Sequence, residues 1–280
     1  MSPLGRRRAA PPGPATDLAA LNHWERTNVL FEAIIGPAPM RPHYLWCLLH
    51  VAGVARHLGY ERFGALELGC AGGNGLVALE VAAGPVEEAL GVGIELHGFD
   101  GTSGMPAPES HRDAPYLIEP GHFPMDTEKL RSRLRRTQLH LGPVGETVHA
   151  FLAEPAAPVG FVIQDLDYHS STRDALALFD APAERFLPRV LSYYDDVLGY
   201  PWALGNGERL ANAEFNASRP ARRIDELRGM AYAVPAAHRH DPWPEALHLV
   251  HVLDHPRYGD YEGTAITTRL DLAPEADTDS

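Results

Sequence analysis

The chain has 280 residues, of which 45% are hydrophobic and 22% charged, and its formal net charge is −13. This is the composition of a globular protein long enough for one large domain, and the negative charge argues against a nucleic-acid partner. No apolar run reaches the length of a membrane span, so we expect no membrane partner. The two cysteines are read as free thiols, which, with no signal-peptide pattern, favours a cytoplasmic location.

The two ends of the chain are predicted to be disordered. Residues 1–16 contain three consecutive arginines and a stretch rich in proline and alanine, and residues 271–280 are acidic and carry no apolar pattern. We expect residues 17–270 to form a single α/β domain, and the chain could form a homodimer.

Helix-like and strand-like patterns alternate along the domain. An N-terminal helical segment is predicted over 17–35 and 42–58, with later helices over 74–83, 126–136 and 171–179. Residues 207–230 read as largely helical, with a break near Pro220. Strands are predicted at 65–68, 91–99, 138–141, 159–163, 190–194 and 247–253. This alternation predicts a doubly wound, mainly parallel sheet with helices on both faces.

A glycine-rich turn follows the first predicted strand. Residues 67–75 read ELGCAGGNG, and in a turn between strand and helix Gly69 and Gly73 allow the backbone to approach a ligand. Asp100 ends the second predicted strand, where a carboxylate can hold a ribose diol. A nicotinamide enzyme is disfavoured because Ala71 replaces the middle glycine and Glu67 would lie beside a pyrophosphate. The alternative is a tight turn that binds nothing.

Aspartates follow two further predicted strands. Asp165 and Asp167 come after the strand at 159–163, and Asp195 and Asp196 come after the strand at 190–194. Because the ends of parallel strands open on one edge of a sheet, these side chains are expected to lie close together. Converging carboxylates typically bind a hard divalent cation. The alternative is a set of solvated loop aspartates, with Asp167 or Asp196 capping a helix.

Two segments carry a family resemblance. Residues 161–172, FVIQDLDYHSST, and residues 189–196, RVLSYYDD, resemble the macrocin O-methyltransferase family of natural-product biosynthesis. The resemblance covers about residues 65–199 and implies the Rossmann-like fold of class I S-adenosylmethionine methyltransferases. It implies that a divalent metal, with Mg²⁺ as the expected ion, binds to Asp165, Asp195 and Asp196. It implies that S-adenosylmethionine is held by Glu67, Gly69, Gly73 and Asp100.

The resemblance also predicts the chemistry. Asp167 is the first candidate for the general base, and His169 is the second because it flanks the predicted site, as His111 and His122 also do. We expect methyl transfer to a hydroxyl of a small-molecule acceptor, such as a sugar diol or a catechol-like ring. The alternatives are a glycosyltransferase that binds a metal and a sugar nucleotide through Asp165 and Asp167, and a non-catalytic relative of the fold.

Overall fold

The computed structural model of the protein describes residues 18, 21–36 and 41–263. The segments 1–16 and 271–280, which we predicted to be disordered, lie outside the described residues. The described strands are β1 (Arg62–Leu68), β2 (Gly93–Asp100), β3 (Gln138–Leu141), β4 (Val159–Gln164), β5 (Phe186–Tyr194), β6 (Arg222–Glu226) and β7 (Leu247–Val252). The described α-helices are α1 (His23–Ile34), α2 (Pro42–His57), α3 (Asn74–Leu90), α4 (Thr127–Arg133), α5 (Val144–Ala153), α6 (His169–Ala175) and α7 (Gly207–Ser218).

The seven described strands form one sheet in the order β3-β2-β1-β4-β5-β7-β6. The first five strands in this order run parallel to one another, and β7 runs antiparallel to both β5 and β6. The prediction of a doubly wound, mainly parallel sheet is confirmed. The strand order reverses between β1 and β4, and in such sheets ligands bind outside the carboxyl ends of the strands at this switch point.

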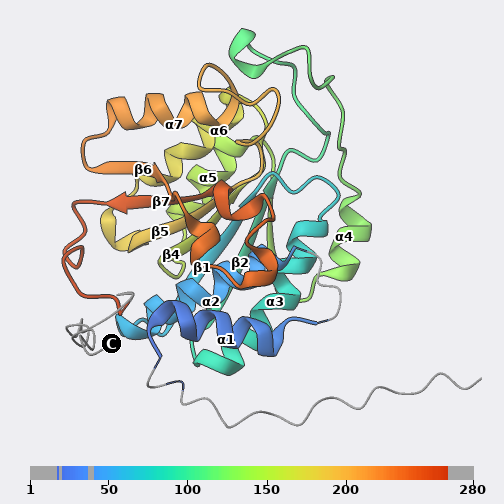
Figure 1. Ribbon diagram of the computed structural model, residues 1–280. Coiled ribbons are helices and arrows are strands. Elements are labelled where there is room, and N and C mark those ends of the chain that lie inside the picture. The colour runs from blue at the N-terminus through green and yellow to red at the C-terminus, as the bar shows by residue number, and fades with distance from the viewer. Residues whose placement is uncertain (1–17, 19–20, 37–40, 264–280) are drawn as a thin grey trace, which may run out of the picture.

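Helices cover both faces of the sheet. In Figure 1, α1, α2 and α3 gather on one side, and α5, α6 and α7 lie on the other. The most deeply packed helix is α2, whose Tyr44 and Trp46 are fully buried between the sheet and α1. Burying side chains of this size contributes about 2 kcal/mol each, so α2 anchors one face of the domain. Both Cys47 in α2 and Cys70 after β1 are free and buried, as predicted.

Backbone hydrogen bonds continue the ladder just beyond the strand ends. The Gly69 N–H donates to the Phe99 carbonyl, the Asp165 N–H to the Leu68 carbonyl and the Asp195 N–H to the Gln164 carbonyl, each at 2.9 Å. These bonds fix the residues that follow β1, β4 and β5 side by side. The strand ends chosen from the sequence therefore meet at one edge.

Two elements differ from the prediction. The stretch 207–230 is helical only to Ser218, and Arg222–Glu226 forms the edge strand β6 because it pairs with β7. The helix α5 was not predicted, since its start, Val144-Gly145, follows Pro143 and reads as a turn. Across the described part of the chain, no helix has both the length and the apolar content needed to cross a bilayer.

Candidate active site

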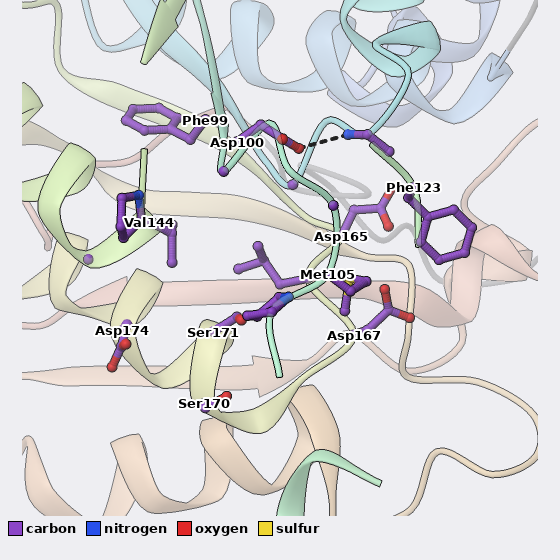
Figure 2. A pocket seen from close by; sticks show the side chains of 18 of the residues that line it. Phe99, Asp100, Met105, Phe123, Val144, Asp165, Asp167, Ser170, Ser171 and Asp174 are labelled. Carbon is purple, nitrogen blue, oxygen red and sulfur yellow. Dashed lines mark hydrogen bonds between the residues drawn. The ribbon is translucent and has the colours of Figure 1, made fainter. Parts of the chain in front are cut away.

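A cavity of about 1160 Å³ opens at the carboxyl edge of the sheet. Its walls come from the ends of β1, β2, β4 and β5, from the start of α5 and α6, and from the loop 101–125. Figure 2 shows Phe99 and Val144 toward one end, Asp165 and Asp167 toward the other, and Asp100 along the edge between them. We call these the apolar end and the acidic end of the cavity, although Asp174 lies toward the first and Phe123 toward the second.

The glycine turn depends on residues without a side chain. Gly69 has φ +87°, and a Cβ there would lie 1.9 Å from the carbonyl oxygen of Asp165. Gly73 has φ +77° and starts α3, where a Cβ would lie 2.2 Å from the side chain of Leu130. Gly69 lines the cavity, whereas Gly73 does not. Gly69 therefore lets the turn pack closely against the residue that follows β4. Gly73 leaves room for Leu130 of α4 at the start of α3.

The carboxylate of Asp100 holds the turn in place. Its Oδ2 accepts hydrogen bonds from the backbone N–H groups of Cys70 and Ala71, both at 2.9 Å. Its Oδ1 accepts one from the N–H of Thr102 at 2.6 Å. A carboxylate oxygen can accept two hydrogen bonds, so Oδ1 keeps one lone pair for a ligand hydroxyl. Asp100 lines the cavity, at the edge between its two ends in Figure 2.

Glu67 lies beneath the turn and does not line the cavity. Its side chain is 1% exposed, and one oxygen accepts a hydrogen bond from the Tyr44 hydroxyl at 3.1 Å. A Cβ at Gly75 would touch this carboxyl group, which shows how closely the start of α3 packs on it. Burial, and then the nearby charge of Asp165, raise the pKa of Glu67 to about 8. Its position supports the turn from below.

Asp165 and Asp195 face the cavity together with an arginine. The guanidinium of Arg41 lies 3.9 Å from Asp165 Oδ2 and 3.9 Å from Asp195 Oδ1. Asp195 Oδ1 also accepts a hydrogen bond from the Tyr193 hydroxyl at 2.8 Å. Burial and the neighbouring charge of Asp195 raise the pKa of Asp165 to about 7, and Arg41 opposes this increase. The structure therefore places Asp165 and Asp195 beside the same guanidinium.

Asp167 and Asp196 form a second carboxyl pair. Their side chains hydrogen-bond each other, and burial raises the pKa of both. The backbone of Asp167 is left-handed, with φ +58°, which is uncommon for a residue with a side chain. Asp196 Oδ2 is buried and has no hydrogen-bond partner. Little positive charge lies near this pair to balance its negative charge.

A further carboxyl group, missed in the sequence, supports both aspartate segments. Glu208 on α7 is fully buried, and it accepts hydrogen bonds from the N–H groups of Leu166 at 3.2 Å and Asp196 at 3.3 Å. Burial and the charge of Asp196 raise its pKa well above the ordinary value. Glu208 comes more than ten residues after Asp196, so only the tertiary fold reveals the contact.

The acidic end contains several carboxyl groups, but they do not converge on one point. Among residues 18, 21–36 and 41–263, no three histidine, cysteine or acidic side chains are arranged to hold a metal ion. Asp165 and Asp195 turn toward Arg41, and Asp196 turns toward Asp167. The three predicted metal ligands therefore share one edge without forming a coordination shell.

The histidines that flanked the predicted site do not line the cavity. The His169 side chain is buried, and its Nε2 lies 2.8 Å from a carboxylate oxygen of Glu214 on α7. His111 starts a short 3₁₀ turn, and His122 lies 3.7 Å from Glu119; both are exposed. Of the residues proposed as general base, Asp167 is the one that lines the cavity.

The loop 101–125 is tied to α6 through a buried carboxylate. Asp113 Oδ1 accepts a hydrogen bond from the Ser170 N–H at 2.8 Å, and its Oδ2 accepts one from the Glu109 N–H at 2.7 Å. The loop thereby places Met105 and Phe123 at the cavity, and Phe123 is 54% exposed.

Comparison with known proteins shows the fold. No protein-family model matches the sequence, and no curated protein sequence matches it. The calicheamicin methyltransferase CalS11 is similar in structure, with a TM-score of 0.51 and 19% identity over 86% of this chain and 99% of that chain.

Two further structures are similar to this chain at lower TM-scores. CalS11 without ligand, a TDP-rhamnose 3′-O-methyltransferase of calicheamicin biosynthesis, has a TM-score of 0.45 and 17% identity over 84% of this chain and 99% of that chain. The O-methyltransferase TomG from Streptomyces achromogenes, involved in tomaymycin synthesis, has a TM-score of 0.41 and 17% identity over 84% of this chain and 92% of that chain. The first similarity, together with the strand order, shows that this chain has the Rossmann-like fold of class I methyltransferases.

Proposed function

We propose that the protein is an S-adenosylmethionine-dependent O-methyltransferase that uses a divalent metal and acts on a hydroxyl of a small molecule. The observation that carries the proposal is the single cavity at the switch point of a methyltransferase fold, into which the glycine turn, Asp100 and the aspartates of β4 and β5 all open. The activities of CalS11 and TomG agree with this assignment.

The two ends of the cavity suggest how the cofactor lies. The apolar end, with Phe99 and Val144, suits a flat adenine ring, and the free lone pair of Asp100 suits a ribose hydroxyl. The turn at Gly69 then leaves room for the amino-acid part of the cofactor. This orientation directs the sulfonium toward Asp165 and the acidic end, where negative charge stabilises a cation. Glu67 would contribute by fixing the turn.

The carboxyl groups of the acidic end fit a hard divalent cation by their chemistry. They are oxygen donors, and the buried Asp196 Oδ2 has no partner in the structure. Asp165, Asp195 and Asp196 would hold the metal, as the family resemblance implies, once their side chains turn toward a common point. When bound, a metal of this kind lowers the pKa of a coordinated hydroxyl.

The mechanism assigns distinct tasks to the side chains of the cavity. Asp167 accepts the proton of the acceptor hydroxyl, and its raised pKa makes it a stronger base than an ordinary aspartate. Asp100 and the turn at Gly69 would hold the methyl donor and orient it toward the acceptor hydroxyl. S-adenosylmethionine supplies an activated methyl group, whose transfer forms a carbon–oxygen bond as the carbon–sulfur bond breaks. The proton remains on Asp167 until water removes it.

The test is a turnover assay with a panel of vicinal-diol glycosides and catechols. We expect formation of S-adenosylhomocysteine with Mg²⁺ and its loss with EDTA or in Asp195→Asn. Asp180→Asn removes a carboxylate that pairs with Arg219 outside the cavity, so it should retain activity and serves as the matched control. Binding of sugar nucleotides without binding of S-adenosylmethionine would contradict the proposal and favour the glycosyltransferase. Cofactor binding without turnover of any acceptor would favour a non-catalytic relative.

A further inference from the structure

Arg41 occupies an unusual position at the acidic end of the cavity. It precedes Pro42, the first residue of α2, and its backbone is left-handed, with φ +66°. Its side chain is 30% exposed and lines the cavity beside Asp165 and Asp195. The guanidinium is 3.9 Å from each carboxylate, which is beyond hydrogen-bond distance. Charge, and not a directed hydrogen bond, holds it there.

The guanidinium also contacts Tyr44, through the same Nη1 that faces Asp195. Arg41 Nη1 donates a hydrogen bond to the Tyr44 hydroxyl at 3.2 Å, and the guanidinium carbon lies 5.3 Å from the centre of the Tyr44 ring. The Tyr44 hydroxyl in turn donates to the buried carboxyl group of Glu67. The hydrogen bond and the ring contact with Tyr44 therefore hold the guanidinium in addition to the charge of the aspartates.

Other cations of the cavity are already engaged. Arg173, which also lines the cavity, pairs with Glu109 at 3.1 Å and with Asp174 at 2.8 Å. Within the described residues, Arg41 is the only basic side chain within 4 Å of Asp165 or Asp195. It is thus the counter-ion of two carboxylates that the proposed function assigns to a metal.

We propose that Arg41 competes with the divalent cation for Asp165 and Asp195 and thereby sets the affinity of the site for metal. This inference rests on the proposed function. A cation held by Asp165 Oδ2 and Asp195 Oδ1 would take the place of the guanidinium that faces these oxygens, and a cation elsewhere between the two carboxylates would be repelled by the guanidinium at close range. Metal binding at these oxygens therefore requires the guanidinium of Arg41 to move away from the aspartates.

The experiment measures binding of Mn²⁺ to the full-length, metal-stripped protein, by the loss of the electron paramagnetic resonance signal of free Mn²⁺. Arg41→Met keeps much of the side-chain length and removes the charge, and Arg41→Lys keeps the charge. The matched control is Arg219→Met, which removes the same charge from an exposed pair with Asp180 outside the cavity. We expect Arg41→Met to bind Mn²⁺ at least about tenfold more tightly than the wild type. Arg41→Lys and Arg219→Met should stay close to the wild type.

The outcomes separate this inference from the proposed function. Equal or weaker binding by Arg41→Met, with binding by the wild type intact, would overturn the competition and leave the metal site standing. An equal gain in Arg219→Met would also overturn it, because the effect would then come from the net charge. If neither wild type nor variants bound Mn²⁺, both the inference and the metal dependence would fail. Circular dichroism checks that the variants are folded. If Arg41→Met does not fold, the test is repeated with Arg41→Gln.

Discussion

The cavity edge has two halves, one at the ends of β1 and β2 and the other at the ends of β4 and β5, and they hold their carboxyl groups in different ways. At β1 and β2, Asp100 accepts hydrogen bonds from three backbone N–H groups. At β4 and β5, Asp165 lies near Arg41 and Asp167 pairs with Asp196, and burial raises the pKa of all three aspartates. In the first half, both oxygens of the cavity-lining Asp100 are hydrogen-bonded without a ligand, and Glu67, whose pKa is also raised by burial, lies outside the cavity. The second lacks positive charge, because Arg41 is its only nearby base among the described residues. Under the proposed function, the first half is the cofactor half, which its hydrogen bonds preorganise, and the second is the acidic half, which would receive a cation.

The largest expected effect concerns the contact between the halves. In Gly69→Ala a Cβ would meet the Asp165 carbonyl oxygen at 1.9 Å with φ at +87°, so we expect a loss of about 4 kcal/mol of unfolding free energy. Urea denaturation measures it. Gly72→Ala is the control, because a Cβ there meets nothing within 4 Å, and it should change stability by less than about 0.5 kcal/mol. Equal effects in the two variants would show that the halves do not meet as described.

The next largest effect is expected from a substitution in the acidic half alone. Asp167→Asn removes the proposed base, so kcat should fall by about 10²-fold or more. The dissociation constant of S-adenosylmethionine should change little, because Asp167 lies at the opposite end from Val144 (Figure 2). Steady-state kinetics and calorimetry measure the two quantities separately. Unchanged kcat would remove Asp167 from the mechanism.

The converse effect belongs to the cofactor half. Asp100→Asn replaces a charged acceptor of three N–H groups with an amide, and we expect a loss of about 2 kcal/mol in the binding of S-adenosylmethionine. Mn²⁺ binding should stay within about twofold of the wild type if the halves act independently. If Asp100→Asn lost its binding of Mn²⁺ and kept its affinity for S-adenosylmethionine, the roles assigned to the two halves would be reversed.

The smallest effect is the pH dependence of stability in the metal-free protein. Burial, and then Asp195, raise the pKa of Asp165 to about 7 in the folded state, against about 4 in the unfolded chain. The folded state therefore binds more protons in between, and the contribution of Asp165 to stability is present below about pH 4 and lost as the pH rises to about 7.

Denaturation at several pH values compares the wild type with Asp165→Asn. Buried histidines such as His43 have lowered pKa values and act in the opposite direction, so the difference between the two proteins isolates the aspartate. We expect the wild type to lose about 2 kcal/mol relative to the variant between pH 5 and pH 8, and Mg²⁺ to reduce this loss. A difference of the opposite sign would contradict the unbalanced charge of the acidic half.

The sequence predicted the strand ends of the site because each followed a buried, apolar run. The turn at Gly69 and the aspartates after β4 and β5 are set by the ladder of a parallel sheet, which a single sequence reveals through its hydrophobic pattern. The edge strand β6 escaped because its residues, RRIDE, carry charges and no apolar run. A strand whose pairing depends on a distant partner leaves little local signal.

Side-chain directions and distant partners were beyond the sequence. His169 lies two residues from Asp167, yet it points to Glu214 on α7 and away from the cavity. Arg41 and Glu208 reach the aspartates from elements far along the chain. The spacing of motifs identifies which residues share an edge, and only packing decides which of their atoms meet.

The most direct test of the account is a calorimetric titration of S-adenosylmethionine into the metal-free protein, repeated with Mg²⁺ and with Asp100→Asn. The account predicts micromolar binding by the wild type and weaker binding by Asp100→Asn, because the cofactor half is complete before the metal arrives. Absence of binding of both S-adenosylmethionine and S-adenosylhomocysteine, with or without Mg²⁺, by the folded wild-type protein would contradict it.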